Sequence, residues 1–541
     1  MSVTERAWDY VIIGGGTAGC ILANRLSADP KISVLVLEAG TPARTPWIRM
    51  PAGFVKLMND PAYNWRFRTE PESALKDRRI TIPRGRGLGG SSLINGMIYV
   101  RGQPEDYDSW SQSGALGWSF EDVLPYFRKL ESFAGGDPAF RGQSGPVNVV
   151  RVTETSPISD SFIEAGAQAG FPVNADYNGA DQTGFGYYQV LQKNGARWHM
   201  GDAYLDPARK RANLAIETGA QVTEISLDGR SVRAVCYRQN GQNLRVRVGG
   251  EVILAAGAVQ SPQILELSGI GDPGHLSAIG LATRHALAGV GRNYQDHFAT
   301  RMNWRVSRGI TLNEKSRGWR LAVALAQYAL ARRGILTLGT GLAHGFVRSR
   351  AEVERPDVQY FFVHASYADA GDRKLDRFPG MTIGVTQMRP QSRGTIHARS
   401  ADPFDPPEIR PNFLDAPIDQ QTIVDGMKVA RRIMAQQAMQ RWIVSETAPG
   451  AEIDRDTEWL DFARSNGQSI YHPVGTCAMG AGPMAVVDCR LRVHGLQGLR
   501  VVDASVMPTL PSANTQAAVM MIAEKAADMI LQDAFQKDRA A

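Results

Sequence analysis

A short apolar run that ends in a glycine-rich turn constrains this chain more than any other feature. Residues 10–13 have the composition of a buried parallel strand, and glycines crowd the turn at 14–19. Residues 18–26 then have helical spacing, and a second apolar run at 33–37 leads to Glu38. The glycines let the backbone approach a pyrophosphate at the helix N-terminus, and the acid can bond a ribose hydroxyl. This order predicts a bound dinucleotide. The acid disfavours NADP, whose 2′-phosphate it would repel, and leaves FAD and NAD open.

The rest of the chain indicates interleaved domains. Its 541 residues are too many for one simple core, and neither an internal repeat nor a low-complexity linker divides them. A second glycine-rich stretch, 84–96, indicates backbone pressed against a flat cofactor. Further strands are expected to join the first one in a single sheet, and they lie at 213–227, 251–258 and 499–503. We also expect a helix from about 516 to 531, and another with Pro262 in its first turn.

Charge and cysteine content argue against several functions. The net charge of +6 is thin for this length and no dense Lys/Arg block occurs, so nucleic-acid binding is not expected. The four cysteines form no CxxC pair and have no zinc spacing with histidine, so we expect reduced thiols and no metal site. The first strand starts near Tyr10, which leaves no room for a signal peptide and favours a cytoplasmic location.

One apolar run raises the question of whether the protein spans or contacts a membrane. The run from Leu321 to Leu330 is too short to span a bilayer, and Arg320, Arg332 and Arg333 flank it. No transmembrane segment is therefore expected. We expect this helix to pack against the rest of the protein. Contact with a membrane surface, which would make the protein peripheral, is the alternative.

Four separate motifs carry a family resemblance. In chain order they are Gly85 through Asn95 with Tyr99, Gly102 and Asp108; Gly257 through Gly271; Tyr471-His472-Pro473; and Asp503-Ala504-Ser505 with Asn514-Thr515-Gln516. With these motifs the chain resembles the glucose–methanol–choline (GMC) oxidoreductases, a family of FAD enzymes, over nearly its whole length.

The resemblance implies an α/β fold, α+β overall, in which a Rossmann-like FAD-binding domain is interleaved with a substrate domain built on an antiparallel sheet with helices. The discontinuous FAD-binding domain is expected at 8–41, 78–102, 197–298 and 465–535. The substrate-binding domain is expected at 42–77, 103–196 and 299–464. The oligomeric state is left open.

By the same resemblance the cofactor is FAD. The residues expected to bind it are Gly14, Gly16, Thr17, Ala18, Gly19, Glu38, Ala39, Arg86, Gly89, Ser91, Asn95, Gly96, Met97, Ile98, Val222, Ala256, Asp503, Ala504, Thr515 and Gln516. The first glycine turn and Glu38 would hold the ADP half, and the segment from Asn95 would lie along the flavin. Some family members bond FAD through a histidine directly before the Asn95 position. Ile94 stands there in this chain, so we predict non-covalent FAD.

Oxidation of an alcohol needs a base for the hydroxyl proton, while the flavin takes the hydride. His472 is expected to be this base because the family's catalytic histidine falls at its position; taken alone, a histidine before a proline is more often structural. Asn514 is expected to bond the substrate oxygen, although a residue at this place can simply cap the following helix. No role is assigned to His297 or His494.

Three aromatic residues, Trp65, Phe361 and Tyr471, are candidates for the substrate pocket. Choline-oxidising relatives carry a glutamate that pairs with the trimethylammonium group, and Leu342 aligns with it here. We therefore expect a neutral primary alcohol, oxidised to its aldehyde, with O2 or a quinone-type acceptor reoxidising the flavin. The alternatives are a choline dehydrogenase, a non-redox hydroxynitrile lyase, a photodecarboxylase and a flavoprotein that only binds.

Overall fold

Two large sheets organise the chain. The computed structural model describes residues 2–307, 311–369 and 374–540. In spatial order the strands of the first sheet are β11 (Leu214–Thr218), β2 (Val34–Glu38), β1 (Ser2–Ile13), β14 (Gln242–Leu254), β13 (Ser231–Gln239) and β12 (Gln221–Asp228), with β27 (Leu499–Val501) also paired to β14. Strands β11, β2, β1, β14 and β27 are parallel, whereas β12 and β13 form an antiparallel extension. The predicted sharing of one sheet by these distant segments is confirmed.

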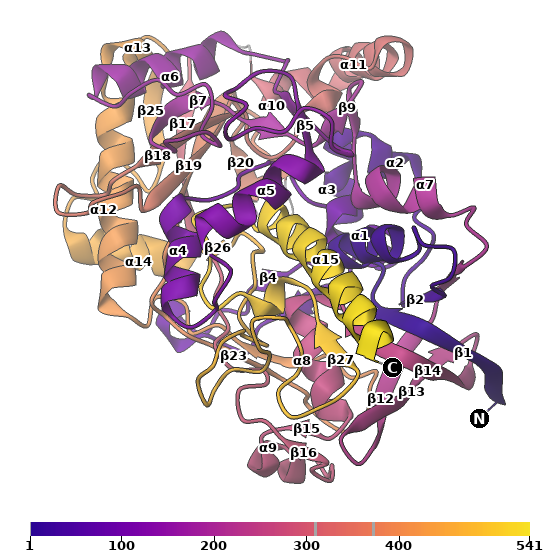
Figure 1. The fold of residues 1–541 in the computed structure, drawn as a ribbon. Coiled ribbons are helices and arrows are strands. Elements are labelled where there is room, and N and C mark those ends of the chain that lie inside the picture. The colour runs from indigo at the N-terminus through magenta and orange to yellow at the C-terminus, as the bar shows by residue number, and fades with distance from the viewer. Residues whose placement is uncertain (1, 308–310, 370–373, 541) are drawn as a thin grey trace.

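Helices from the two ends of the chain lie together beside this sheet. The first, α1 (Thr17–Leu26), follows the glycine turn, and α15 (Gln516–Ala540) runs alongside it (Figure 1). Arg25 of α1 forms an ion pair of 2.7 Å with the buried Glu524 of α15. The predicted helix from 516 is therefore confirmed, and it continues beyond the expected end.

The position of Pro262 differs from the prediction. Helix α8 (Gly257–Leu267) already begins at Gly257, so Pro262 lies inside it rather than in its first turn. Proline has no N–H to donate, which leaves the carbonyl of Ala258 without its intrahelical partner. The hydroxyl of Thr476 donates to this carbonyl at 2.6 Å, and this tertiary contact offsets the lost helical bond.

The second sheet is antiparallel. Its strands, in spatial order, are β25 (Ile443–Ala448), β17 (Phe298–Val306), β22 (Gly380–Gln387), β19 (Val358–Val363), β18 (Ala343–Val347) and β7 (Gly184–Tyr187), with β26 (Gln468–Ser469) also paired to β17. Two helices, α6 (Pro157–Gln168) and α12 (Pro417–Met434), cover it, and the rings of Phe162 and Phe362 stack 4.4 Å apart at the contact. The α/β fold with a Rossmann-like part and an antiparallel part is confirmed, while the segment boundaries stay a prediction.

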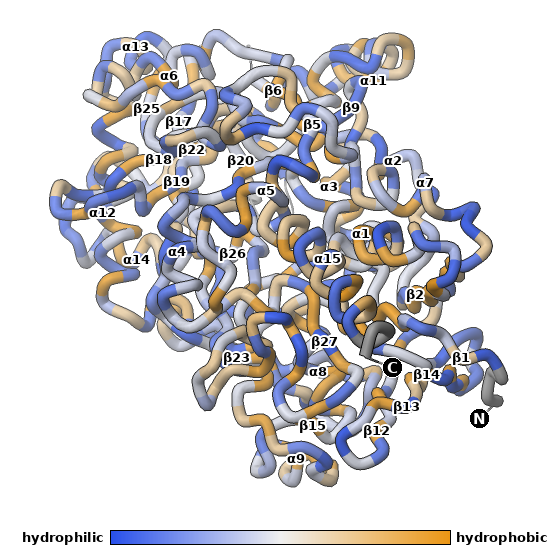
Figure 2. The backbone as a smooth tube through the Cα atoms, viewed as in Figure 1, coloured by the Kyte–Doolittle hydropathy of each residue, from blue (hydrophilic) through white to orange (hydrophobic). Residues whose placement is uncertain are grey.

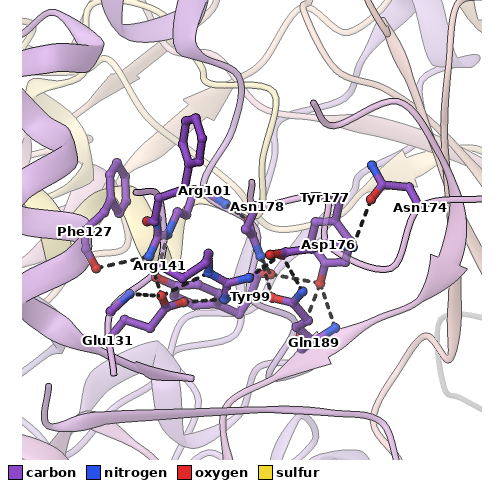
Figure 3. A network of polar contacts seen from close by, with 12 residues as sticks. Tyr99, Arg101, Phe127, Glu131, Arg141, Asn174, Asp176, Tyr177, Asn178 and Gln189 are labelled. Carbon is purple, nitrogen blue, oxygen red and sulfur yellow. Dashed lines mark hydrogen bonds and ion pairs between the residues drawn. The ribbon is translucent and has the colours of Figure 1, made fainter. Parts of the chain in front are cut away.

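A buried ion network holds the chain beyond the second glycine stretch (Figure 3). The carboxylate of Glu131, which is fully buried, pairs with Arg101 and with Arg141, each at 2.5 Å. Arg101 also donates to the hydroxyl of Tyr99, and the hydroxyl of Tyr177 donates to the Tyr99 carbonyl. Removing one partner would leave an uncompensated buried charge, so this network fixes the course of the backbone after the segment expected along the flavin.

The helix expected at Leu321 to Leu330 packs through a narrow side only, which is less than predicted. Helix α11 (Gly318–Ala331) buries only Ala324 and Tyr328, and the rest of its surface is largely exposed. Apolar residues lie all around this helix, so its sequence does not single out one face to bury. Within the described part of the chain, no helix combines the length and the apolar character that crossing a bilayer requires.

Candidate active site

One long cavity joins the two sheets. Its walls include Ile13 and Leu37 from the parallel sheet, Ala255 directly after β14, and Phe361 and Gly384 from the antiparallel sheet. Its volume is about 310 Å³. The glycine turn lies along the same cavity as His472 and Asn514, which the sequence separates by most of its length. A single elongated ligand can therefore contact both regions.

The glycines of the first turn test whether a dinucleotide fits. A Cβ on Gly14 would lie 2.5 Å from the Ala255 carbonyl oxygen, and one on Gly19 would lie 1.9 Å from the Gly14 oxygen. These two glycines serve the turn and the packing of α1. A Cβ on Gly16 would have its nearest neighbour 3.9 Å away, so this position leaves room on the cavity side. No side chain caps α1, and its first N–H groups are available to a phosphate. The arrangement fits the division of labour among glycines in dinucleotide-binding turns.

Glu38 lies at the end of β2 in the cavity wall. Its carboxylate accepts backbone N–H bonds from Gly15 at 2.8 Å, Gly40 at 2.7 Å and Gly87 at 3.0 Å. Burial raises the pKa of Glu38, and these three donors oppose the rise. The side chain thus ties both glycine-rich stretches together. A carboxylate has about four acceptor sites, so capacity for a ribose hydroxyl remains.

The segment expected along the flavin has an unusual backbone. Met97 has a φ of +63°, a left-handed conformation that is uncommon without glycine. The Asn95 side chain holds it, because Oδ1 accepts from the Met97 N–H at 3.1 Å and from the buried Arg197 at 2.7 Å. The Nδ2 group of Asn95 donates to Gln516 at the start of α15. This segment therefore connects to the C-terminal part of the site.

Most of the predicted FAD residues line this cavity. Those that do are Gly14, Gly16, Thr17, Ala18, Glu38, Ala39, Ser91, Asn95, Gly96, Met97, Ile98, Val222, Ala256, Asp503, Ala504, Thr515 and Gln516. Gly19, Arg86 and Gly89 do not, and the guanidinium of Arg86 lies over the ring of Trp65 at 4.6 Å. Direct contact of all twenty with FAD stays a prediction.

His472 in the cavity wall forms a hydrogen-bonded pair with His297, which lies behind the lining. Nε2 of His297 lies 2.9 Å from the Met388 carbonyl oxygen, and Nδ1 of His297 lies 2.9 Å from Nδ1 of His472. Because a carbonyl only accepts, Nε2 of His297 must carry the proton, and its Nδ1 is then an acceptor when the ring is neutral. His472 consequently carries its proton on Nδ1. Its Nε2 is left with a lone pair, which is the state a base requires.

Asn514 faces that lone pair. Its Nδ2 lies 3.3 Å from Nε2 of His472, and its Oδ1 accepts from Nε2 of Gln359 at 3.3 Å. Gln359 also donates to the hydroxyl of Tyr188. The amide of Asn514 is thus oriented with its donor toward His472.

Two hydrogen bonds from other segments hold the loop that carries His472. The backbone N–H of His472 donates to Asp296 at 2.8 Å, and Arg84 donates to the Tyr471 carbonyl at 2.9 Å. Tyr471 has a φ of +73°, so the turn before His472 is locally strained. Burial lowers the pKa of His472 well below its usual range, and the nearby His297 and Arg84 lower it further. Burial also lowers the pKa of His297 to about 4, so both rings are neutral at pH 7.

The three aromatic substrate candidates all line the cavity, and so does Arg301 of β17. Leu342 is fully buried outside this lining, in a small apolar cluster behind it. The described lining contains two acidic side chains, Glu38 and Asp503. Asp503 accepts from the Gly257 N–H and from the Ser261 hydroxyl, on the parallel-sheet side.

Sequence reasoning assigned no role to His297 and did not identify Gln359 or Arg301. His297 directly precedes β17 and Gln359 lies in β19, so only the pairing of the antiparallel strands brings them beside the C-terminal loops. The local sequence around Gln359 is an ordinary buried strand. The contact of Gln359 with Asn514 is recognisable only once the position of β19 is known.

Comparison with known proteins gives a consistent result. Two profiles of one family, both described as GMC oxidoreductase, match residues 8–299 and 390–523. An alcohol dehydrogenase [acceptor] from Pseudomonas putida is 42% identical over 97% of this chain and 96% of its own length. An oxygen-dependent choline dehydrogenase from Photobacterium profundum is 41% identical over 97% and 93%. A solved formate oxidase from Aspergillus oryzae, studied for modification of its FAD, superposes with a TM-score of 0.91 at 26% identity, covering 99% of this chain and 100% of that chain.

Proposed function

The chain belongs to the GMC oxidoreductases and is an FAD enzyme that oxidises alcohols, and we propose that its substrate is a primary alcohol whose hydroxyl proton is taken by Nε2 of His472. The observation that carries this proposal is the direction of the hydrogen-bond chain from Met388 through His297 to His472. It supports a neutral His472 that presents a lone pair to the cavity. FAD, when bound, supplies the acceptor for the hydride.

The protein residues act on the oxygen of the alcohol. The substrate O–H donates to Nε2 of His472, and the amide Nδ2 of Asn514 is close enough to donate to the same oxygen. As the proton moves to Nε2, negative charge that develops on the oxygen is stabilised by this amide. The imidazolium that forms keeps its Nδ1–H bond to His297. The lowered pKa of His472 keeps the ring in its basic form at neutral pH.

Cavity charge favours a neutral alcohol over choline. The carboxylates in the described lining, Glu38 and Asp503, are both engaged by backbone N–H groups on the parallel-sheet side. The antiparallel sheet instead contributes Arg301. Among the described lining residues, the antiparallel sheet contributes no carboxylate that could pair with a quaternary ammonium. Trp65, Phe361 and Tyr471 provide an apolar wall for the carbon chain or ring of the substrate.

The electron acceptor is proposed to be O2 or a quinone-type compound. The test is to mix the yellow protein anaerobically with a panel of primary alcohols and follow bleaching of the flavin. Reoxidation is then followed as peroxide formed in air and as reduction of an added quinone. His472→Ala should slow flavin reduction by about 10²–10⁴-fold. His285→Ala, outside the cavity lining, is the matched control. Unchanged reduction in His472→Ala would refute the assignment of the base.

A further inference from the structure

Helix α11 exposes a large share of its apolar side chains. The exposed fractions are 73% for Trp319, 55% for Val323, 44% for Leu325 and 88% for Leu330. Figure 1 places α11 at the margin of the molecule, and Figure 2 shows apolar residues along it. Single exposed apolar residues are ordinary, but several on one helix mark an interaction surface.

Basic residues surround this apolar surface. Arg320 lies in the helix, Arg317 precedes it, and Arg332 and Arg333 follow it; all four are exposed. Between residues 316 and 333 the sequence contains no acidic residue. The combination of exposed Trp and Leu with arginines at the edges matches both parts of an anionic lipid surface, since the apolar groups enter the acyl boundary and the guanidinium groups meet the phosphates.

The helix is fixed to the body of the protein on one side only. The hydroxyl of the buried Tyr328 donates to the Arg49 carbonyl at 3.2 Å, and Arg332 donates to that hydroxyl at 3.1 Å. After the helix, the Gly334 N–H donates to Glu154 at 2.7 Å. These contacts hold α11 in place and leave its apolar residues facing outward.

The length of α11 determines how it can meet a bilayer. Its 14 residues correspond to about 21 Å, short of the roughly 30 Å of a hydrocarbon core. We propose that α11 lies in the interface of a membrane that contains anionic lipid and docks the protein there as a peripheral enzyme. Leu330 and Trp319 are the apolar anchors, and Arg320 and Arg333 contribute the electrostatic attraction.

Vesicle flotation tests the proposal without any turnover. The purified holoenzyme is mixed with vesicles of phosphatidylcholine alone or of equal parts phosphatidylcholine and phosphatidylglycerol. We expect flotation with the anionic vesicles, weakened by added salt because screening reduces the attraction. Trp319→Ala with Leu330→Ser should reduce the partition constant by about tenfold or more, given the apolar area removed. Arg320→Gln with Arg333→Gln should weaken the preference for anionic vesicles.

Controls separate this proposal from folding defects and from the catalytic assignment. Leu116→Ser removes an equally apolar side chain that is 70% exposed outside α11, and it should leave flotation unchanged. Flavin reduction by a water-soluble alcohol should be unaffected in all variants. Equal binding by the wild type and the Trp319/Leu330 variant would overturn the proposal. So would a dimer in solution that the same variant dissociates while neither protein floats, because the surface would then join two copies of this chain.

Discussion

Nδ1 of His297 and Nδ1 of His472 lie 2.9 Å apart, and the carbonyl on the far side of His297 decides which of them holds the proton. His297→Leu would remove the acceptor and allow His472 to adopt the tautomer that protonates Nε2. We expect flavin reduction by alcohol to fall by about 10²-fold or more, in the direction known for a catalytic histidine with the wrong tautomer. In His297→Asn, the amide oxygen can accept from Nδ1 of His472 and should restore much of the rate. Stopped-flow reduction would measure both variants, and equal rates in Leu and Asn would contradict the role.

Substitution of Asn514 should slow flavin reduction more than substitution of Gln359. Asn514→Leu removes a donor to the substrate oxygen and should lower the flavin-reduction rate by about 10²–10³-fold. Gln359→Met keeps the volume but frees the Asn514 amide to rotate, so the loss should be near tenfold. An equal loss in the two variants would mean that Gln359 does more than orient Asn514.

Arg301 should discriminate against cationic alcohols. Choline and 3,3-dimethylbutan-1-ol have the same shape and differ in one charge, so their ratio of kcat/KM isolates the electrostatic contribution. We expect discrimination on the order of tenfold, which corresponds to about 1.4 kcal/mol. We expect the neutral alcohol to be preferred by the wild type, and Arg301→Glu to shift the ratio toward choline. A preference for choline in the wild type would contradict the proposed discrimination against cationic alcohols.

Denaturation of the protein should release FAD in unmodified form. Ile94 occupies the place from which a histidine would bond the flavin, and its side chain is buried and apolar. Precipitation with acid, followed by centrifugation, should leave all of the yellow colour in the supernatant. Flavin that stays with the pellet and resists washing would contradict non-covalent binding.

His344 should make the protein less stable in acid. Its ring is fully buried among Tyr177, Tyr188 and Phe346, and burial lowers its pKa to about 3. The unfolded state, with a pKa near 6.5, binds the proton first, so this stability is complete above pH 6.5 and is lost as the pH falls toward 3. Replacement by Phe should reduce the pH dependence of the free energy of unfolding by about 1.4 kcal/mol per pH unit in that range. Urea unfolding at several pH values would show the change in slope, and an unchanged slope would contradict the assignment.

The sequence predicted those parts of the site that depend on local geometry. The glycine turn at 14–19 and Glu38 form within one βαβ unit, so their spacing alone indicated a dinucleotide. His472 and Asn514 were found through a family resemblance, since neither position is distinctive by itself. His297, Gln359 and Arg301 could not be assigned because their facing depends on the register of an antiparallel sheet. The extent to which helix α11 is exposed could not be predicted because an apolar sequence does not say whether a partner is present to cover it.

The pairing of β27 with β14 also fixes when the protein can acquire its cofactor. The parallel sheet that begins at residue 2 is completed by residues 499–501, and Asp503, Thr515 and Gln516 then close the cavity wall. During synthesis the glycine turn leaves the ribosome long before these residues exist. We therefore expect FAD to bind stably only after synthesis has passed Gln516. Loss of the segment from residue 499 onward would remove β27 and this part of the cavity wall, and we expect it to prevent stable flavin binding.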